Sequence, residues 1–180
     1  MFETERLILR PLYEGDYKAW VNGYTQALPR QGPFDASVLS TEELSEACFR
    51  NLLWSDWHAF EAGWSFNFYA FRKETGVFVG ASQVWGVQRG DCQRGTLGFW
   101  VLNTHWRQGL GYEMAEATLR YGFHDLGLHR IEAEVLPQNE SSIFLCQKLG
   151  MQSEGLRRGA LRVDGLWRDH AVFSLLASDG

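Results

Sequence analysis

Residues 107–113, Arg-Gln-Gly-Leu-Gly-Tyr-Glu, decide the fold of this chain. They follow a strand-like run at 96–101 and open a helix-like run at 114–123. A glycine-rich turn that enters a helix presents backbone N–H groups without partners, and the helix dipole adds positive potential at the same end. Such a turn binds phosphate. The segment predicts an anion-binding turn for a nucleotide-like cofactor, with ordinary turn chemistry as the alternative.

Other phosphate-binding motifs do not match this segment. The chain has no Gly-x-x-x-x-Gly-Lys-Ser/Thr sequence, which disfavours a P-loop NTPase. A dinucleotide-binding fingerprint needs a third glycine, and Met114 stands at that position. The turn also lies past the middle of the chain, whereas that fingerprint belongs to an early βαβ unit. These mismatches favour a different class of phosphate-bearing cofactor.

Several motifs in the same order resemble the GNAT acetyltransferase superfamily. The stretch 108–111, Gln-Gly-Leu-Gly, resembles the Gln/Arg-x-x-Gly-x-Gly/Ala pyrophosphate loop of that family. About thirty residues later, 139–142 (Asn-Glu-Ser-Ser) and 148–151 (Lys-Leu-Gly-Met) resemble its Asn-x-x-Ser and Lys-Leu-Gly-Phe segments. Because the order is kept, the set is far more specific than any one motif.

Both ends of the chain resemble the RimJ/RimL branch of this superfamily, whose members acetylate ribosomal proteins. The opening 3–11, Glu-Thr-Glu-Arg-Leu-Ile-Leu-Arg-Pro, is similar to the first strand of that branch. The tail, at 154–156 and 163–170, is similar to the RimJ type in particular. The resemblance covers nearly the whole chain and is weakest between about residues 25 and 65.

Size and composition predict a single globular domain, residues 1–180. The net charge of −5 does not support nucleic-acid binding. It suits a cationic substrate, although plain solubility explains so mild a charge equally well. Cys48, Cys92 and Cys146 are widely spaced, which argues against a disulfide framework or a metal site. No apolar run is long enough for a leader or a membrane span, so we expect a cytoplasmic protein, monomer or homodimer.

The hydrophobic periods predict a mixed α/β chain in the order β-α-α-β-β-β-α-β-α-β-β. A capping box at Ser40 and Glu43 predicts the start of a helix that ends at Gly63. The last two strands form a hairpin turned at Asp164-Gly165. The resemblance implies the GNAT fold: a mostly antiparallel seven-stranded mixed sheet, flanked by helices and splayed between strands 4 and 5. The two strands that splay apart are those at 99–101 and at Glu134-Val135.

The resemblance also implies that acetyl-CoA is bound as a co-substrate. Backbone amides of the turn, with the side chains of Arg107 and Gln108, suit the pyrophosphate. The pantetheine arm carries amides and can pair with a strand edge. The predicted cofactor-binding residues are Phe99, Trp100, Val101, Arg107, Gln108, Gly109, Leu110, Gly111, Tyr112, Asn139 and Ser142. As alternatives, residues 99–101 form a plain core strand, and Asn139 and Ser142 merely cap a helix.

For catalysis, the resemblance implies that Ser142 lies near the sulfur and hydrogen-bonds to or protonates the departing thiolate. Glutamates that related enzymes carry are absent here, where Thr96 and Leu161 stand instead. Glu116 matches a glutamate that the family often has and is the predicted base. The other candidates are Glu113, His105, Asp169 and His170, and each of these polar residues has a structural role as its alternative.

The implied acceptor is the N-terminal α-amine of a ribosomal protein. An α-amine has a pKa near 8 and is partly neutral already, whereas a lysine side chain needs more help. An enzyme for a small amine and a CoA-binding module without turnover stay open as alternatives. Trp54, Trp57 and Trp64 cluster where the resemblance is thinnest and can wall an acceptor cleft or serve ordinary packing.

Overall fold

The computed structural model describes residues 1–36, 38–163 and 165–179. In these residues eight strands form one sheet, accompanied by helices. The strands are β1 (Phe2–Glu3), β2 (Leu7–Arg10), β3 (Ser65–Arg72), β4 (Phe78–Gln88), β5 (Arg94–Val101), β6 (Arg130–Val135), β7 (Gln152–Val163) and β8 (Leu166–Leu176). The helices are η1 (Glu14–Asp16), α1 (Tyr17–Thr25), α2 (Glu46–Glu61), η2 (Asn103–His105), α3 (Leu110–His124) and α4 (Glu140–Lys148).

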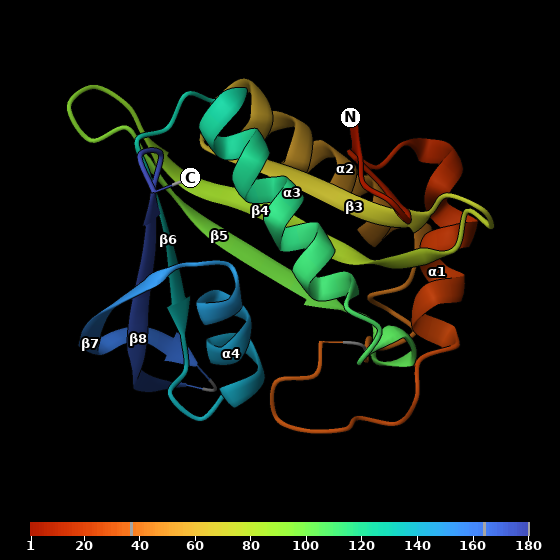
Figure 1. The fold of residues 1–180 in the computed structure, drawn as a ribbon. Helices are drawn as coiled ribbons and strands as arrows, with labels where there is room; N and C mark the ends of the chain where they lie inside the picture. Colours follow the sequence, from red (N-terminus) through yellow and green to blue (C-terminus); the bar gives the residue numbers. More distant parts are fainter. Residues whose placement is uncertain (37, 164, 180) are drawn as a thin grey trace.

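The sheet has the strand order β1-β2-β3-β4-β5-β6-β8-β7 (Figure 1). In the described chain, neighbouring strands pair antiparallel except β5 and β6, which are parallel because α3 crosses between them. The mixed, mostly antiparallel architecture predicted for the chain is confirmed. The predicted seven strands become eight because Phe2–Glu3 pairs with Ile8 and Leu9, and two residues are too few to show a period.

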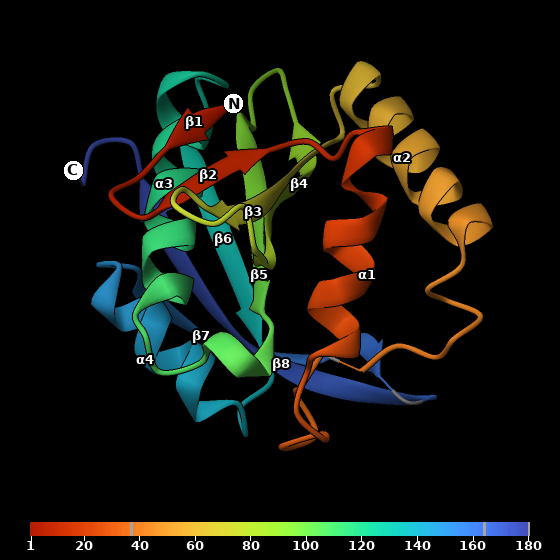
Figure 2. The ribbon, with the colours of Figure 1, turned by 90° about the vertical axis from the view of Figure 1, so that its right-hand side faces the viewer.

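Each face of the sheet has its own apolar core, because side chains alternate along every strand. Leu97 and Ile131 lie on the face that packs against α3 and α4. Tyr69 and Ala81 lie on the opposite face, against Trp20 of α1 and the aromatic side of α2. Figure 2 shows the two pairs of helices on opposite sides of the sheet. The even-numbered residues of β5 and β6 therefore face the α1 side.

Helix α2 begins later than the sequence predicted. Ser40 and Glu43 do exchange the bonds of a capping box, with Ser40 N donating to the Glu43 carboxylate at 2.8 Å. These bonds close a turn, and the helix starts at Glu46, where Ser45 accepts from Cys48 N at 3.3 Å. The predicted start was therefore wrong by one turn and a half. The predicted end is confirmed, with Gly63 left-handed at φ 65°.

The predicted C-terminal hairpin is formed by β7 and β8. Of its predicted turn, Asp164 lies outside the described residues, and Gly165 has a φ of 78°. In Figure 2 the two strands reach toward the α1 side of the sheet. Among the helices of the described residues, none combines the length and the apolar character needed to cross a membrane.

Candidate functional site

The turn before α3 has the backbone of an anion-binding loop. Gly109 is left-handed with φ 77°, and so is Arg107 with φ 58°, which is uncommon for a residue with a side chain. Leu110 begins the helix with its side chain buried. Helix geometry leaves the N–H groups of residues 110–112 without partners inside the helix. Together with the helix dipole, these amides form a site for a diphosphate.

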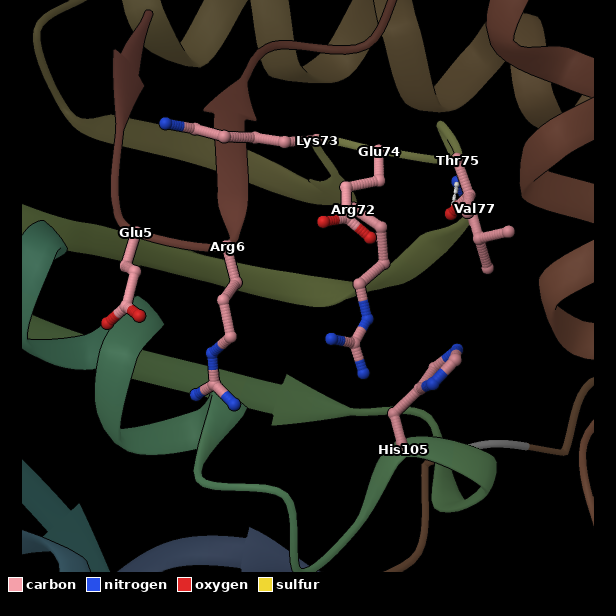
Figure 3. A pocket seen from close by; sticks show the side chains of 8 residues that line it. All are labelled: Glu5, Arg6, Arg72, Lys73, Glu74, Thr75, Val77 and His105. Atoms are coloured by element: carbon pink, nitrogen blue, oxygen red, sulfur yellow. Dashed lines mark hydrogen bonds between the residues drawn. The ribbon is translucent and has the colours of Figure 1, made fainter.

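Two arginines from the β2–β3 end of the sheet border this turn. Arg6 Nη1 donates to the backbone oxygen of Gln108 at 2.9 Å, and Arg72 donates to the side-chain oxygen of Gln108. Arg6, Arg72, Lys73 and His105 line a hollow of about 350 Å³. In Figure 3 the side chains of Arg6, Arg72 and His105 point into it. Because guanidinium groups suit phosphate oxygens, they add to the anion-binding character of the turn.

Glu113, one of the predicted bases, instead joins the N-terminal segment to α3. Its carboxylate accepts from the Thr4 hydroxyl, from Arg6 N at 2.8 Å and from Arg6 Nε at 2.7 Å. Burial alone would raise the pKa of Glu113, but these hydrogen bonds outweigh it and the pKa is lowered. Glu113 is thus an ionised structural anchor that holds Arg6 beside the turn.

We expect Glu113→Gln to lower the free energy of unfolding at pH 7 by about 1–3 kcal/mol. The pKa of Glu113 is lower in the folded protein than in the unfolded chain. Its stabilising contribution is therefore present above the unfolded pKa of about 4.3 and is lost as the pH falls through the folded pKa. Denaturant unfolding of the unsubstituted protein and of Glu113→Gln, at pH 7 and at about pH 3, measures this difference in the free energy of unfolding. The exposed Glu116→Gln is the control. A difference of equal size at both pH values would contradict this role.

Strands β5 and β6 separate along their length. In the described chain their parallel pairing joins Arg94, Gly95 and Thr96 to Arg130, Ile131 and Glu132, and it ends there. Both strands continue, β5 to Val101 and β6 to Val135. In Figure 1 they start side by side and diverge toward their C-terminal ends. The splay predicted between strands 4 and 5 of a seven-stranded sheet is confirmed at β5 and β6, and we call this opening the split.

The edge of β5 that faces the split offers backbone hydrogen bonds. Leu102 N donates to Val79 O of β4 at 2.8 Å, so the backbone groups of Leu102 face β4. Alternation then turns the backbone groups of Phe99 and Val101 toward β6, beyond the end of the ladder. The indole of Trp106 donates to Val101 O at 2.7 Å. An amide-bearing chain can pair with this edge as an added strand does.

Trp100 belongs to the packed core of the opposite face. Its ring lies 5.7 Å from the ring of Tyr24 in α1 and 5.7 Å from that of Phe78 in β4. By the same alternation, its backbone groups face β4. Of the three strand residues predicted to bind the cofactor, Phe99 and Val101 therefore border the split with their backbone, and Trp100 follows the core-strand alternative.

Asn139 and Ser142 meet at the start of α4. The side-chain oxygen of Asn139 accepts from Ser142 N at 3.3 Å and so caps the helix. Ser142 is half-buried in the first turn. Asn139 therefore caps the helix, and the roles of both residues toward a cofactor stay predictions.

Glu116 lies on the exposed side of α3. It accepts from the hydroxyl of Tyr112 at 2.7 Å, and this bond raises the pKa of Tyr112. The Tyr112 ring in turn lies 4.5 Å from the ammonium of Lys148, in the last turn of α4. Ser142 is at the other end of that helix, and in the described residues no hydrogen bond joins it to Glu116. The catalytic role of Glu116 stays a prediction.

The remaining predicted bases each have a local structural role, and Asp169 is exposed. His105 lies in η2, where burial and the nearby charge of Arg72 lower its pKa. Asp169 accepts from the backbone N–H of Gly159 at 2.8 Å, across the β7–β8 hairpin. His170 is buried in β8, with Nδ1 3.2 Å from the backbone oxygen of Arg168. The contacts of all three are thus explained by local structure.

The tryptophans of the weakly resembling region lie on the surface. Trp54 and Trp57 are 67% and 58% exposed and line a hollow of about 620 Å³ between α2 and the segment after β2. Asn67 of β3 also lines it, and β4 separates β3 from β5 in the sheet. Trp64 packs near Trp85, with ring centres 6.1 Å apart. The structure therefore places this hollow two strands away from the split.

The geometry of turn and split has a match among known families. Residues 6–152 match the family model described as an acetyltransferase (GNAT) domain. The chain belongs to the GNAT acetyltransferase family. Acetyl-CoA is the co-substrate of this family, and the residues around the turn fit it: a left-handed glycine, helix amides and two arginines meet where a diphosphate would lie. The family resemblance drawn from the motifs is confirmed.

Curated relatives include two proteins of similar identity. The probable N-acetyltransferase YjcK of Bacillus subtilis is 32% identical over 114 residues, covering 63% of this chain and 63% of that protein. The [ribosomal protein uS5]-alanine N-acetyltransferase of Escherichia coli is 32% identical over 117 residues, covering 65% of this chain and 60% of that protein. The matched part thus spans less than two thirds of the length of these GNAT relatives.

Solved structures agree over almost the whole chain. RimJ of Mycobacterium smegmatis, in complex with CoA-disulfide, has a TM-score of 0.81 at 25% identity and covers 96% of this chain and 83% of that one. The ribosomal-protein-S5-alanine acetyltransferase of Vibrio fischeri has a TM-score of 0.81 at 21% identity, with coverages of 99% and 97%, and this shows the fold alone. RimJ/RimL-type proteins are therefore among the structural neighbours of this GNAT chain.

Sequence reasoning missed charged residues on both sides of the site. Arg6 and Arg72 are far from Gln108 in the sequence, and the local pattern does not predict that they contact it. Glu132 and Glu134 were also missed, although their alternation with Ile131 and Ala133 in a predicted strand places both carboxylates on one face. The resemblance did imply that the strand at Glu134-Val135 splays away from the strand at 99–101, but neither glutamate was considered there as a base.

Proposed function

We propose that this GNAT protein transfers the acetyl group of acetyl-CoA directly to a primary amine. The observation that carries the proposal is the split between β5 and β6, which opens beside the left-handed turn before α3. The turn, from Arg107 to Tyr112, holds the diphosphate, and the pantetheine pairs with the free edge at Phe99 and Val101. Asn139 contacts the pantetheine while capping α4.

In this proposal Ser142 serves the leaving group. Its hydroxyl lies beside the sulfur and hydrogen-bonds to or protonates the CoA thiolate. Cys146 is not used as a nucleophile, since its side chain is buried and burial raises the pKa of its thiol to about 11. Transfer then occurs in one step between thioester and amine, without an acyl-enzyme.

We further propose that the acceptor is the N-terminal α-amine of a ribosomal protein, in the cytoplasm. The name of the Escherichia coli relative supports a ribosomal acceptor. The chemistry supports an α-amine, because its pKa near 8 leaves a useful neutral fraction at neutral pH. The Cys48, Cys92 and Cys146 thiols are free, which suits a reducing compartment.

Mass spectrometry tests the function. The protein is incubated with acetyl-CoA, a peptide that begins with Ala or Ser, and a panel of small amines. We expect the peptide to gain the mass of one acetyl group at its N-terminus, and a peptide with a blocked N-terminus to gain nothing. Acetylation of a small amine alone would show that the acceptor is a small amine and not a protein N-terminus. No gain on any acceptor, with CoA bound tightly, would leave a CoA-binding module and contradict the enzyme.

A further inference from the structure

A carboxylate lies beside the split on the α1 side of the sheet, the face that His170 of β8 shares. Glu132 and Glu134 are even-numbered residues of β6, so both face the α1 side of the sheet. Glu132 stands at the last paired position, opposite Thr96. Glu134 stands two residues further, about 7 Å along a strand, where β5 and β6 have already separated. Its position is therefore next to the opening.

The two carboxylates differ in their partners. Among the described residues, Glu132 pairs with three arginines: Arg130 at 2.9 Å, Arg94 at 3.5 Å and Arg157 at 3.6 Å. Glu134 pairs with Arg157, whose Nη1 donates to Glu134 Oε1. The charge of Glu132 is thus held in a structural network, while that of Glu134 is balanced by a single cation.

Arg157 covers Glu134 from outside. The helices on this face, α1 and α2, pack on β4 and β3 rather than on β6. Yet the Glu134 side chain is only 12% exposed, while that of Arg157 is 47% exposed. Arg157 lies in an irregular part of β7, between the left-handed residues Gly155 and Gly159, where the pairing with β8 shifts register. Moving this arginine aside uncovers the carboxylate without unpacking a helix.

We propose that Glu134 binds the amino group of the acceptor and takes its proton, and that Arg157 occupies this place until the acceptor arrives. The inference rests on the proposed function. The acceptor reaches the split from the α1 side, and its ammonium replaces the guanidinium of Arg157 as the cation at Glu134. An internal ion pair thus marks the amine site in the free protein.

The chemical step balances with these groups. The amine nitrogen forms a bond to the acetyl carbonyl carbon, and the bond between that carbon and sulfur breaks. The acceptor arrives as the ammonium and gives its first proton to the Glu134 carboxylate, directly or through one water, so that the attacking nitrogen is neutral. The second proton leaves the nitrogen after the attack and passes to water, while CoA leaves as the thiolate. The thiolate takes a proton from solvent, or from Ser142, which regains one from solvent, and Glu134 returns its proton to solvent. The products are an N-acetyl amide and CoA.

The test compares Glu134→Gln with Glu154→Gln. Glu154 belongs to the same ionic cluster, bound to Arg130 and Ser174, but lies on β7 at the outer edge of the sheet. With the acceptor found by mass spectrometry, we expect kcat of E134Q to fall at least about 100-fold, and that of E154Q to stay within about threefold. Acetyl-CoA affinity by calorimetry should not change in E134Q, and circular dichroism should show that this variant is folded.

Arg157→Ala tests the proposed role of Arg157 at the amine site. If Arg157 fills the amine site, its removal lowers KM for the acceptor and leaves KM for acetyl-CoA unchanged. An unchanged or higher acceptor KM would overturn the role of Arg157. Retained kcat in a folded E134Q that binds acetyl-CoA would overturn the role of Glu134 alone. An unsubstituted protein that acetylates no amine would overturn the proposed function, and this inference with it.

Discussion

Gly111→Leu is expected to weaken CoA binding at least about 100-fold, or about 2.7 kcal/mol. A Cβ at position 111 would lie 3.4 Å from Leu145 Cδ1 and 3.5 Å from Val101 Cγ2. The remaining atoms of a leucine have no room there, so they push α4 away from the edge of β5 where the pantetheine is proposed to lie. The same shift tilts the first turn of α3 and its phosphate-binding amides.

The matched control is Gly111→Ala. Its single methyl group fits the space at 3.4 Å, and alanine favours a helix by about 1 kcal/mol over glycine. We expect G111A to bind CoA like the unsubstituted protein and to melt at the same or a higher temperature. Isothermal titration with CoA measures both variants, after circular dichroism has shown that G111L is folded. A folded G111L with unchanged affinity would refute the placement of CoA at this turn.

Phe49→Ala is expected to destabilise the fold by about 3–5 kcal/mol, a large part of the stability of an ordinary domain. Phe49 is 2% exposed, and its ring lies 5.2 Å from that of Trp20 and 5.4 Å from that of Tyr17. This contact fixes α2 against α1 on the face from which the acceptor is proposed to enter. Truncation leaves a cavity that the surrounding rings cannot fill.

Trp57→Ala is the control on the same helix. Trp57 is larger than Phe49 but 58% exposed, so we expect its loss to change the free energy of unfolding by no more than about 0.5 kcal/mol. Denaturant titration of F49A and W57A separates burial from side-chain size. A loss of similar size in both variants would contradict the core assigned here.

Local patterns were enough for the turn and for most of the elements around it. Glycine spacing predicted the turn, and Gly109 is left-handed there. Two-residue periods predicted the strands, since one face of each strand is buried. The pattern was weaker at α2, where a genuine capping box at Ser40 and Glu43 closes a turn outside the helix. A capping box satisfies backbone donors in either setting, so its sequence alone does not fix where a helix begins.

The charged partners of the site depend on tertiary contacts that no local pattern encodes. Arg6, just before β2, contacts Gln108 because the turn before α3 lies beside the paired strands β2 and β3. Glu113 was considered as a base because it is an acid beside the turn, yet Thr4 and Arg6 hold it as an anchor. Glu134 was not considered as a base, although the resemblance put the splay at Glu134-Val135, because its pairing with Arg157 of β7 is a tertiary contact.

A crystal structure with CoA bound tests the central claim most directly. We predict the diphosphate within hydrogen-bonding distance of the backbone N–H groups at residues 109–112, and the pantetheine between β5 and β6 along Phe99 and Val101. CoA bound elsewhere, or a diphosphate away from this turn in a protein that acetylates amines, would contradict the account.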